Sequence, residues 1–424
     1  MKHIIKPYTI RHVRLDNFQH DASIFPEPSD SFYLVFWYHS IALGHLYLEK
    51  EQVYKNWRED VWNAVSGAVH FYNNNKISED RLKESFINNS DQLTILFDQV
   101  FKDHLPKNIP ATVPVSLVIC TANRNKDLEV CLQSLSQQAC LPEEIIIVDN
   151  SPDVGNTKSI AEKWNAIYCK EPQKGLSYAR NTGIKKATQS YIAWVDDDVT
   201  THPHWCYHIW KAFVDSNADV VLGLVLAAEL ETESQQVFEK HWTFNRGYLP
   251  KTFDHDWFNN KLTYGPPVWE LGAGANMAFK KEIYDKVGLF DVRLGAGTSG
   301  CSEDSEMWFR ILKQKGLIFY EPKCIVYHTH RKDMDVLKKQ LKNYMRGFVV
   351  AALLQQRQYP SANYKKQLFQ AMPKYYINLV RAGFPGFNFR YTTLRSEMIG
   401  IAEGFMYFFK HKDSPSQINA NHDE

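Results

Sequence analysis

The middle of the chain alternates short apolar runs with amphipathic stretches, and this order constrains the fold more than any other feature of the sequence. Apolar runs at 115–120, 145–149, 166–169 and 191–195 are separated by segments with apolar residues at helical spacing. Short strands connected by helices are typical of a parallel sheet whose two faces are both covered. The sequence therefore predicts an α/β domain with a mostly parallel sheet flanked by helices.

Polar residues follow three of these runs directly. Residues 121–124 (TANR) follow the first run, residues 149–151 (DNS) end the second, and residues 196–198 are three consecutive aspartates. Ligands of such sheets bind beyond the carboxyl ends of the strands, so the three clusters are expected to meet at one edge. An arbitrary acidic triplet is usually a solvated turn. Three carboxylates that a buried strand delivers to a ligand-binding edge instead indicate a bound cation.

Residues 1–110 are expected to form an accessory module, β-rich or α/β, that ends in a linker. The stretch 32–48 predicts two β segments joined by a polar turn. A helix is predicted next from four apolar residues at four-residue spacing: Val53, Trp57, Val61 and Val65. The segment 99–114 has three prolines and no periodicity, which is typical of a linker. The α/β domain is therefore expected over residues 111–334.

Residues 335–424 are predicted to form a helical extension with a disordered tail. Apolar residues at helical spacing run from Leu337 to Ala352, and a second apolar stretch follows at 397–409. Neither reaches the ~20 apolar residues needed to span a bilayer. These helices are expected to pack on the α/β domain, and a helix that lies on a membrane surface is the alternative. The polar segment 412–424 is the predicted disordered tail.

Composition excludes several classes of function. The formal net charge of +1 over 424 residues gives no basic field for a nucleic acid. The seven cysteines form no CxxC pair, which is typical of a reducing compartment and argues against a structural zinc site. The first residues have no apolar segment of the kind found in signal peptides. The expected location is the cytoplasm, with the inner face of a membrane as the alternative if the C-terminal helices bind lipid.

Six segments in this order resemble the family-two glycosyltransferases of GT-A fold. They are LVICTANR at 117–124, IIIVDNS at 145–151, GLSYARNTGI at 175–184, WVDDDV at 194–199, the glycine-containing stretch at 271–291, and SEDSEMWFRI at 302–311. The resemblance covers about half of the chain. It implies a metal-dependent, hexosyltransferase-like enzyme that moves a sugar from a nucleotide-diphosphate-sugar, with UDP favoured, to a hydroxyl acceptor with inversion. The acceptor would be a polysaccharide, a glycolipid or a related lipid-linked glycan.

The resemblance also assigns roles to residues. The triplet is similar to the family's DXD motif, which implies Mg²⁺ or Mn²⁺ bound by Asp196 and Asp198, with His328 as a further ligand in some relatives. It implies Asp304 as the general base, and the adjacent Glu303 is the other candidate. The donor-binding residues that it implies are Thr121, Asn123, Arg124, Asp149, Arg180, Asp196, Asp197, Gly274 and Asn276.

Simpler explanations and other functions stay open at this level. A structural role alone could explain several of these residues. Glu303 and Asp304 would then belong to the capped start of a helix after Ser302, and Gly272 and Gly274 would form a turn. His328 could be a surface histidine. A sugar nucleotidyltransferase would have a glycine-rich phosphate loop after the first strand, but CTANRNKD contains no glycine. A non-catalytic nucleotide-sugar or carbohydrate-binding relative would be expected to lack the triplet or the Glu-Asp pair, and both are present.

Overall fold

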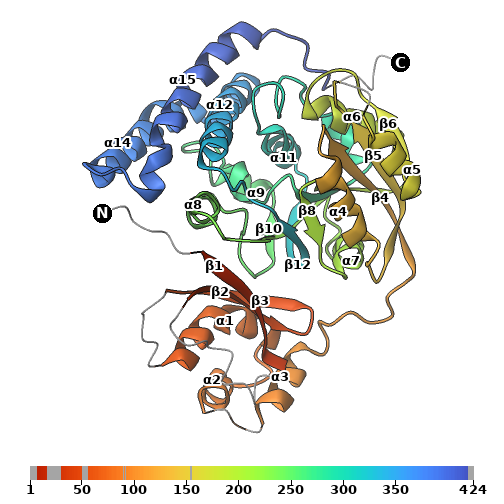
Figure 1. The fold of residues 1–424 in the computed structure, drawn as a ribbon, viewed down its shortest axis with the longest axis vertical. Coiled ribbons are helices and arrows are strands. Elements are labelled where there is room, and N and C mark those ends of the chain that lie inside the picture. The colour runs from red at the N-terminus through yellow and green to blue at the C-terminus, as the bar shows by residue number, and fades with distance from the viewer. Residues whose placement is uncertain are drawn as a thin grey trace.

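The computed structural model describes residues 7–16, 30–49, 56–88, 90, 92–152 and 155–418. The small N-terminal module lies at one end of the molecule, the α/β domain forms the centre, and the C-terminal helices α14 (Met372–Gly383) and α15 (Leu394–His411) lie at the other end (Figure 1). The N-terminal module and the two helices are thus on opposite sides of the domain that holds the polar clusters.

The N-terminal module is a three-stranded sheet with three helices. Its elements are β1 (Tyr8–Arg14), β2 (Ser31–Tyr38), β3 (Ile41–Leu48), α1 (Trp57–Asn73), α2 (Glu79–Ile87) and α3 (Leu93–Phe101). Strand β2 pairs in parallel with β1 and antiparallel with β3. The predicted β segments and the helix with Trp57 are confirmed, whereas Val53 lies outside the described residues. Side chains such as Phe36, Trp62 and Phe97 form the core between this sheet and its helices.

The other face of the module's sheet packs on the α/β domain. Tyr33, Val35 and Trp37 belong to the same buried cluster as the core of that domain. The Trp37 ring stacks on His202, with 5.7 Å between the ring centroids. Side chains of one strand alternate between its two faces, so β2 supplies both cores. A shared core therefore holds the module against the α/β domain.

The α/β domain contains a nine-stranded sheet. Its strands are β4 (Thr112–Thr121), β5 (Leu141–Asp149), β6 (Ile167–Lys170), β7 (Tyr191–Asp196), β8 (Val199–Thr201), β9 (Val220–Ala227), β10 (Lys251–Phe253), β11 (Asn276–Lys280) and β12 (Ile318–His328). Their order is β10-β12-β9-β11-β7-β4-β5-β6, and β8 pairs with β12.

The sheet is parallel in one half and mixed in the other. Strands β7, β4, β5 and β6 pair in parallel, as do β9 and β12. Strand β11 runs antiparallel between β7 and β9. The predicted α/β fold, a sheet flanked by helices, is confirmed, and the antiparallel pairs that β8, β10 and β11 form make the sheet mixed. Strand β11 starts at the edge of the sheet where β7 ends, so it runs in the direction opposite to β7. Apolar runs in the sequence do not reveal the direction of a strand.

Helices cover both faces of this sheet. They are α4 (Asn125–Leu135), α5 (Thr157–Lys163), α6 (Leu176–Lys186), α7 (Trp205–Ser216), α8 (Glu233–His241), α9 (His255–Asn259), η3 (Val268–Glu270), α10 (Ile283–Val287) and α11 (Glu303–Lys313). Along β4, Leu117 and Ile119 enter the core with α4 and α7, while Val118 enters the core on the opposite face. Two cores therefore position the strand ends from both sides.

The chain after β12 is helical, as predicted. Its elements are α12 (Met334–Gln358), η4 (Pro360–Ala362), α13 (Tyr364–Lys366), the π-helical segment η5 (Gln367–Ala371), α14, η6 (Phe389–Thr393) and α15. Helices α12 and α15 pack closely because glycine leaves room at the contact: a Cβ on Gly400 would lie 2.2 Å from the Lys342 carbonyl oxygen. Across the described residues, no helix has the length and apolarity to cross a membrane.

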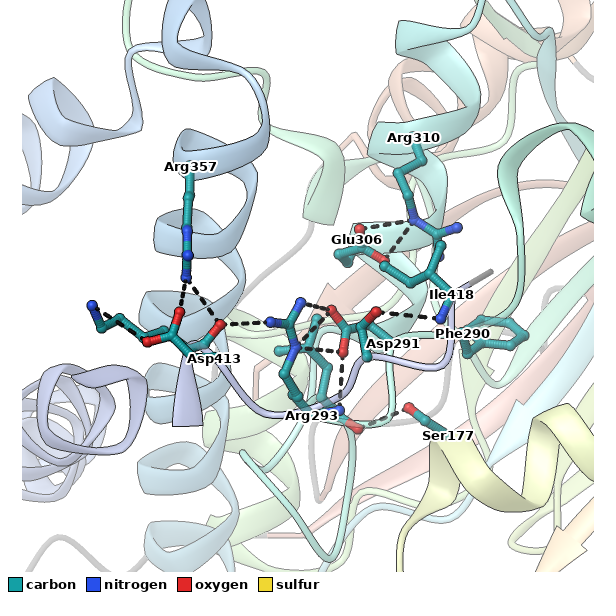
Figure 2. Close-up of polar contacts among 12 residues, drawn as sticks. Ser177, Phe290, Asp291, Arg293, Glu306, Arg310, Arg357, Asp413 and Ile418 are labelled. Carbon is teal, nitrogen blue, oxygen red and sulfur yellow. Dashed lines mark hydrogen bonds and ion pairs between the residues drawn. The ribbon is translucent and has the colours of Figure 1, made fainter. Parts of the chain in front are cut away.

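The start of the predicted disordered tail is packed against the α/β domain. The backbone N–H groups of Leu289 and Val292 donate to the carbonyls of Ile418 (2.8 Å) and Ser416 (3.0 Å). Arg357 donates to Asp413 over 2.7 Å, beside the buried Asp291–Arg293 pair (Figure 2). The prediction of disorder is wrong for residues 412–418, because their polar backbone finds partners that composition does not show. Residues 419–424 lie outside the described part.

Candidate active site

The three polar clusters predicted to converge do meet at one edge of the sheet. The Thr121 hydroxyl, at the end of β4, donates to Asp197 over 2.7 Å. The backbone N–H of Asn123 donates to the Ser151 hydroxyl over 2.9 Å, with Asn123 in the left-handed region at φ 59°. Parallel strands end side by side, so residues far apart in the sequence share this edge.

The three aspartates of the triplet have different surroundings. Asp197 is buried and accepts hydrogen bonds from Thr121 and from Arg124 (2.8 Å). One oxygen of Asp198, Oδ2, lies 3.0 Å from Arg124 and 3.1 Å from Arg331. Asp196 is the open member, since its side chain is 40% exposed. Asp197 therefore fixes the triplet to β4, Asp198 is held by two arginines, and Asp196 is the member that is open to solvent.

The surroundings of Asp196 disfavour its negative charge. Desolvation, followed by the neighbouring charge of Asp198, raises the pKa of Asp196 to about 7. Burial also raises the pKa of Asp197, although Arg124 opposes that effect. Such raised carboxylate pKa values are typical of functional sites. A cation bound at this edge would relieve the repulsion between the carboxylates.

A buried chain of polar contacts leads away from the other oxygen of Asp198. Nε2 of His328 lies 3.5 Å from Asp198 Oδ1. Nδ1 of His328 lies 2.9 Å from Nδ1 of His330, and Nε2 of His330 lies 3.0 Å from a carboxylate oxygen of Glu239. Burial lowers the pKa of His328 to about 4, so this imidazole is neutral near pH 7. The four residues are named the histidine relay below.

The contacts of the histidine relay are consistent with one arrangement of donors and acceptors. If the Glu239 carboxylate accepts from His330 Nε2–H, Nδ1 of His330 is left as an acceptor. His328 must then donate from Nδ1, so its Nε2 carries a lone pair on the side of Asp198. Asp198 Oδ1 is itself buried and accepts no hydrogen bond. A nitrogen lone pair and an unpaired carboxylate oxygen side by side fit a divalent cation.

The predicted metal ligands are not assembled around one point. Among the residues that the structure describes, no group of three or more His, Cys, Asp or Glu side chains is arranged to hold an ion. Asp198 and His328 are close together, whereas Asp196 lies on the other side of the triplet, 3.9 Å from Arg180. The protein thus offers an incomplete ligand set, which is typical of Mg²⁺ sites that substrate phosphates and water complete.

Glu303 and Asp304, at the start of α11, differ in availability. Arg180 donates to Glu303 over 2.6 Å, and both side chains are buried. Burial raises the pKa of Glu303, against the opposing effect of Arg180. Asp304 is partly exposed and, among the described residues, accepts from the Ser305 N–H (2.6 Å) and hydroxyl (3.1 Å). Ser302 is the N-cap residue of α11, but its side chain makes no capping hydrogen bond, so capping by Ser302 does not explain the pair.

The glycine loop before β11 packs directly on this acidic pair. A Cβ on Gly274 would lie 2.8 Å from an Asp304 carboxylate oxygen and 3.0 Å from an Arg180 nitrogen. The predicted close approach of the backbone is therefore present, but it is an approach to protein groups. Gly272 packs on Leu222 instead, where a Cβ would lie 2.9 Å from a methyl carbon.

The structure does not support Asn276 as a donor-binding residue. Its side chain is fully buried, accepts from the Trp205 indole (2.9 Å), and donates to the carbonyls of Leu224 (3.0 Å) and Cys324 (2.8 Å). The pairing of β12 with β9 shifts register just before Ile325, which leaves carbonyls that need a donor. The amide of Asn276 satisfies them, so it has no polar group left for a ligand.

Asp149 is also bound by protein groups, which the sequence did not reveal. It accepts from the Ser151 N–H (2.9 Å), the Tyr168 hydroxyl (2.9 Å) and Lys170 Nζ (3.2 Å). Burial alone would raise its pKa, but these hydrogen bonds outweigh burial and lower it. Tyr168 and Lys170 lie on β6, whose weak apolar pattern gave no sign of a functional contact.

Three further residues of the site were missed from the sequence. His330 and Arg331 follow His328 in the same strand-end segment, so their position was a usable signal. Glu239 is 91 residues away from His330 and lies in the middle of α8, where nothing marks it as special. Only the packing of α8 beside the end of β12 brings it to the histidines.

Comparisons with known proteins agree on the class of protein. Residues 116–288 match the family model described as Glycosyl transferase family 2. The glucosyl-dolichyl phosphate glucuronosyltransferase of Haloferax volcanii is 22% identical over 240 residues, 53% of this chain and 72% of that protein. Glycosyltransferase AglE of the same organism is 29% identical over 243 residues, 55% of this chain and 72% of that protein. The chondroitin synthase of Escherichia coli is 22% identical over 300 residues, 65% of this chain but 42% of the synthase.

Solved structures with related folds are more distant. The mannosyltransferase PcManGT from Pyrobaculum calidifontis, in complex with GDP-Man and Mn²⁺, aligns with a TM-score of 0.45 and 14% identity over 73% of this chain and 94% of that one. Glucosyl-3-phosphoglycerate synthase from Mycobacterium tuberculosis, in complex with Mn²⁺, UDP and glucosyl-3-phosphoglycerate, aligns with a TM-score of 0.39 and 14% identity over 55% and 78%.

The mixed sheet with helices on both faces, the matched segment and the named relatives define the protein as a glycosyltransferase. The matched segment, residues 116–288, is similar to glycosyl transferase family 2.

Proposed function

We propose that this glycosyltransferase moves a sugar from a nucleotide-diphosphate-sugar to a hydroxyl of a glycan or lipid-linked acceptor, with inversion and with Mg²⁺ or Mn²⁺ as cofactor. One observation carries the proposal. Arg180 lies 2.6 Å from Glu303 and 3.9 Å from Asp196, so it joins the acidic pair of α11 to the acidic triplet in a single site. A cation-binding edge and a carboxylate base are the two parts that such a transfer requires.

The cation would be held by Asp198 and His328, with Asp196 as the third protein ligand. When bound, it neutralises the charge that develops on the departing diphosphate. Arg124 and Arg331 contact Oδ2 of Asp198 and leave Oδ1 free. The two arginines thus orient the carboxylate, and the histidine relay orients the imidazole, without occupying the atoms that would bind the ion.

Asp304 is the proposed general base. It takes the proton of the acceptor hydroxyl while that oxygen attacks the anomeric carbon and the diphosphate leaves from the opposite face. Glu303 is buried in its pair with Arg180, whereas Asp304 is partly exposed beside Gly274. A single displacement of this kind needs no covalent sugar intermediate and inverts the anomeric centre.

The direct test is release of nucleoside diphosphate from a panel of nucleotide-sugars. Slow hydrolysis of one donor is expected with Mn²⁺ or Mg²⁺, together with its loss in the presence of a chelator. Calorimetric binding of a nucleotide-sugar with no hydrolysis, and with no transfer to any hydroxyl acceptor, would favour the non-catalytic alternative instead.

The relay should control metal affinity. Glu239→Gln removes the charge that keeps the proton on His330, so His328 is no longer held with its Nε2 lone pair toward Asp198. Outer-shell substitutions typically weaken metal binding about 10- to 100-fold, and we expect the lower end of that range for Mn²⁺. Electron paramagnetic resonance of free Mn²⁺, in the presence of a nucleoside diphosphate, measures this without any turnover.

The matched control is Glu233→Gln on the same helix, because Glu233 is partly exposed and lies outside the relay. It should leave Mn²⁺ affinity unchanged. Equal affinities for the two variants would remove Glu239 and His330 from the metal site.

We further propose that the donor is a uridine nucleotide-sugar. Asp149 ends β5 at the edge where the polar clusters meet, and its carboxylate oxygens are acceptors of the kind that a donor group of a base or ribose would need. Calorimetry with Mn²⁺ should show tighter binding of UDP than of GDP or dTDP, and Asp149→Asn should reduce that preference. Tighter binding of GDP would contradict the assignment.

A further inference from the structure

The C-terminal helices expose an unusual share of the molecule's large apolar side chains. Within the described part of the chain, ten of the seventeen exposed large apolar side chains lie between 369 and 409, and they are between 36% and 73% exposed. Those on α15 are Met398, Ile399, Met406 and Phe409, which share one side of the helix, opposite the glycines Gly400 and Gly404 that pack on α12. The C-terminal apolar surface is defined here by six of the ten: Phe369, Tyr375, Phe384, Met398, Met406 and Phe409.

This surface belongs to one packed unit. The Phe369 ring stacks on Phe405 of α15, with 5.6 Å between the ring centroids. The Tyr376 hydroxyl of α14 donates to Glu397 of α15 over 3.0 Å. The inner face of α15 holds Gly400 and Gly404 against α12. The apolar side chains therefore stay exposed although the helices that carry them are well anchored, and packing on the α/β domain does not account for them.

The unpaired charges of the segment that carries the apolar surface are all of one sign. Six exposed cations lie in this segment, and none of them forms an ion pair with another described residue: Lys365, Lys366, Lys374, Arg381, Arg395 and Lys410. Between residues 364 and 412 the acidic residues are Glu397 and Glu403. Glu397 is buried with Arg390, and Glu403 pairs with Lys342 and Arg346. Exposed apolar residues with unpaired cations and no free acid match an anionic lipid surface.

The segment that joins α14 to α15 lies near the end of the chain that leaves the candidate active site. Helix α12 starts at Met334, shortly after Arg331 and His328 of the metal-binding edge. The Thr392 hydroxyl of η6 lies 3.9 Å from the Met334 sulfur. The segment that joins α14 to α15 thus lies beside the chain that leaves the site, as an enzyme with a lipid-anchored acceptor would require.

We propose that α14 and α15 dock the protein on the surface of a membrane that contains anionic lipids, with the C-terminal apolar surface inserted among the headgroups. The binding step itself is independent of the proposed function, because it needs neither donor, metal nor acceptor. It adds to that function by placing the acceptor in a lipid surface.

Co-sedimentation of the full chain with lipid vesicles tests the proposal. The protein should pellet with phosphatidylcholine vesicles that contain phosphatidylglycerol and should stay in the supernatant with phosphatidylcholine alone. Met406→Ser combined with Phe409→Ser should weaken binding at least about tenfold, because both side chains would lose their burial in lipid. Lys374→Gln combined with Lys410→Gln should also weaken vesicle binding, and this loss should be larger at low salt than at high salt.

The control is Phe71→Ser on α1, since Phe71 is 49% exposed and lies on the N-terminal module. It should bind as the unchanged protein does. The proposal is overturned if the unchanged protein does not pellet, or if the Met406 and Phe409 variant pellets equally well. It is also overturned if that variant splits a dimer in sedimentation analysis without changing lipid binding, because a second copy of the chain would then cover this surface.

Discussion

Asp198→Asn is expected to abolish sugar transfer and metal-dependent nucleotide binding together. The substitution keeps the shape of the side chain, so Arg124 and Arg331 can still contact it, but it removes the charge beside His328. Loss of a charged ligand in such a site costs several kcal/mol, which corresponds to a rate lower by on the order of 10³-fold. Turnover of the donor and calorimetry of UDP with and without Mn²⁺ measure the two effects.

The thermal midpoint of this variant is the control, because a folded protein with unchanged metal-free nucleotide affinity isolates the role of the metal. Asp198→Ala should behave in the same way with some additional loss of stability, since two arginines lose a partner. Wild-type turnover, or unchanged Mn²⁺-dependent affinity for UDP, would show that Asp198 is not a metal ligand.

Asp304→Asn should lower turnover by roughly 10²-fold or more while donor binding changes little, because only the basicity of the group is lost. The position of Asp304 supports this choice: it is partly exposed and makes no ion pair within the described residues, whereas Glu303 is buried against Arg180. The anomeric configuration of the product, determined by nuclear magnetic resonance, should be inverted.

Glu303→Gln serves as the comparison. It leaves the buried Arg180 guanidinium without its closest partner, and breaking a buried pair typically costs about 3–5 kcal/mol of stability. A lower thermal midpoint is therefore expected for Glu303→Gln but not for Asp304→Asn. An active Asp304→Asn beside a folded, inactive Glu303→Gln would move the base to Glu303, and a product of retained configuration would refute the mechanism.

The sequence predicted the parts of the fold that depend on apolar periodicity. Strands β4, β5, β6 and β7 and their helices follow from such patterns, and parallel strand ends necessarily bring Thr121, Asp149 and Asp197 together. The direction of β11 and the packing of residues 412–418 could not be predicted in the same way. Both depend on backbone hydrogen bonds to distant segments, and neither leaves a periodic signal in the side chains.

The same distinction applies to the candidate site. Motif positions predicted that the triplet and the acidic pair belong to one site, and in the structure Arg180 joins them, since it contacts Glu303 and approaches Asp196. Asn276 was misjudged because a motif gives a residue's position in the chain but not the carbonyls around it. Glu239 was invisible because its importance arises only from contact with His330 across 91 residues.

The paired charges around the triplet also bear on how this protein can diverge from its relatives. Arg124 is held by Asp197, and a descendant that lost Arg124 alone would keep a buried carboxylate whose one remaining side-chain partner is Thr121. Positions 124 and 197 should therefore change together in evolution, since residues in contact co-vary. Asp198 has two arginine neighbours, so a lineage can lose Arg331 or Arg124 singly and still keep one cation beside that aspartate.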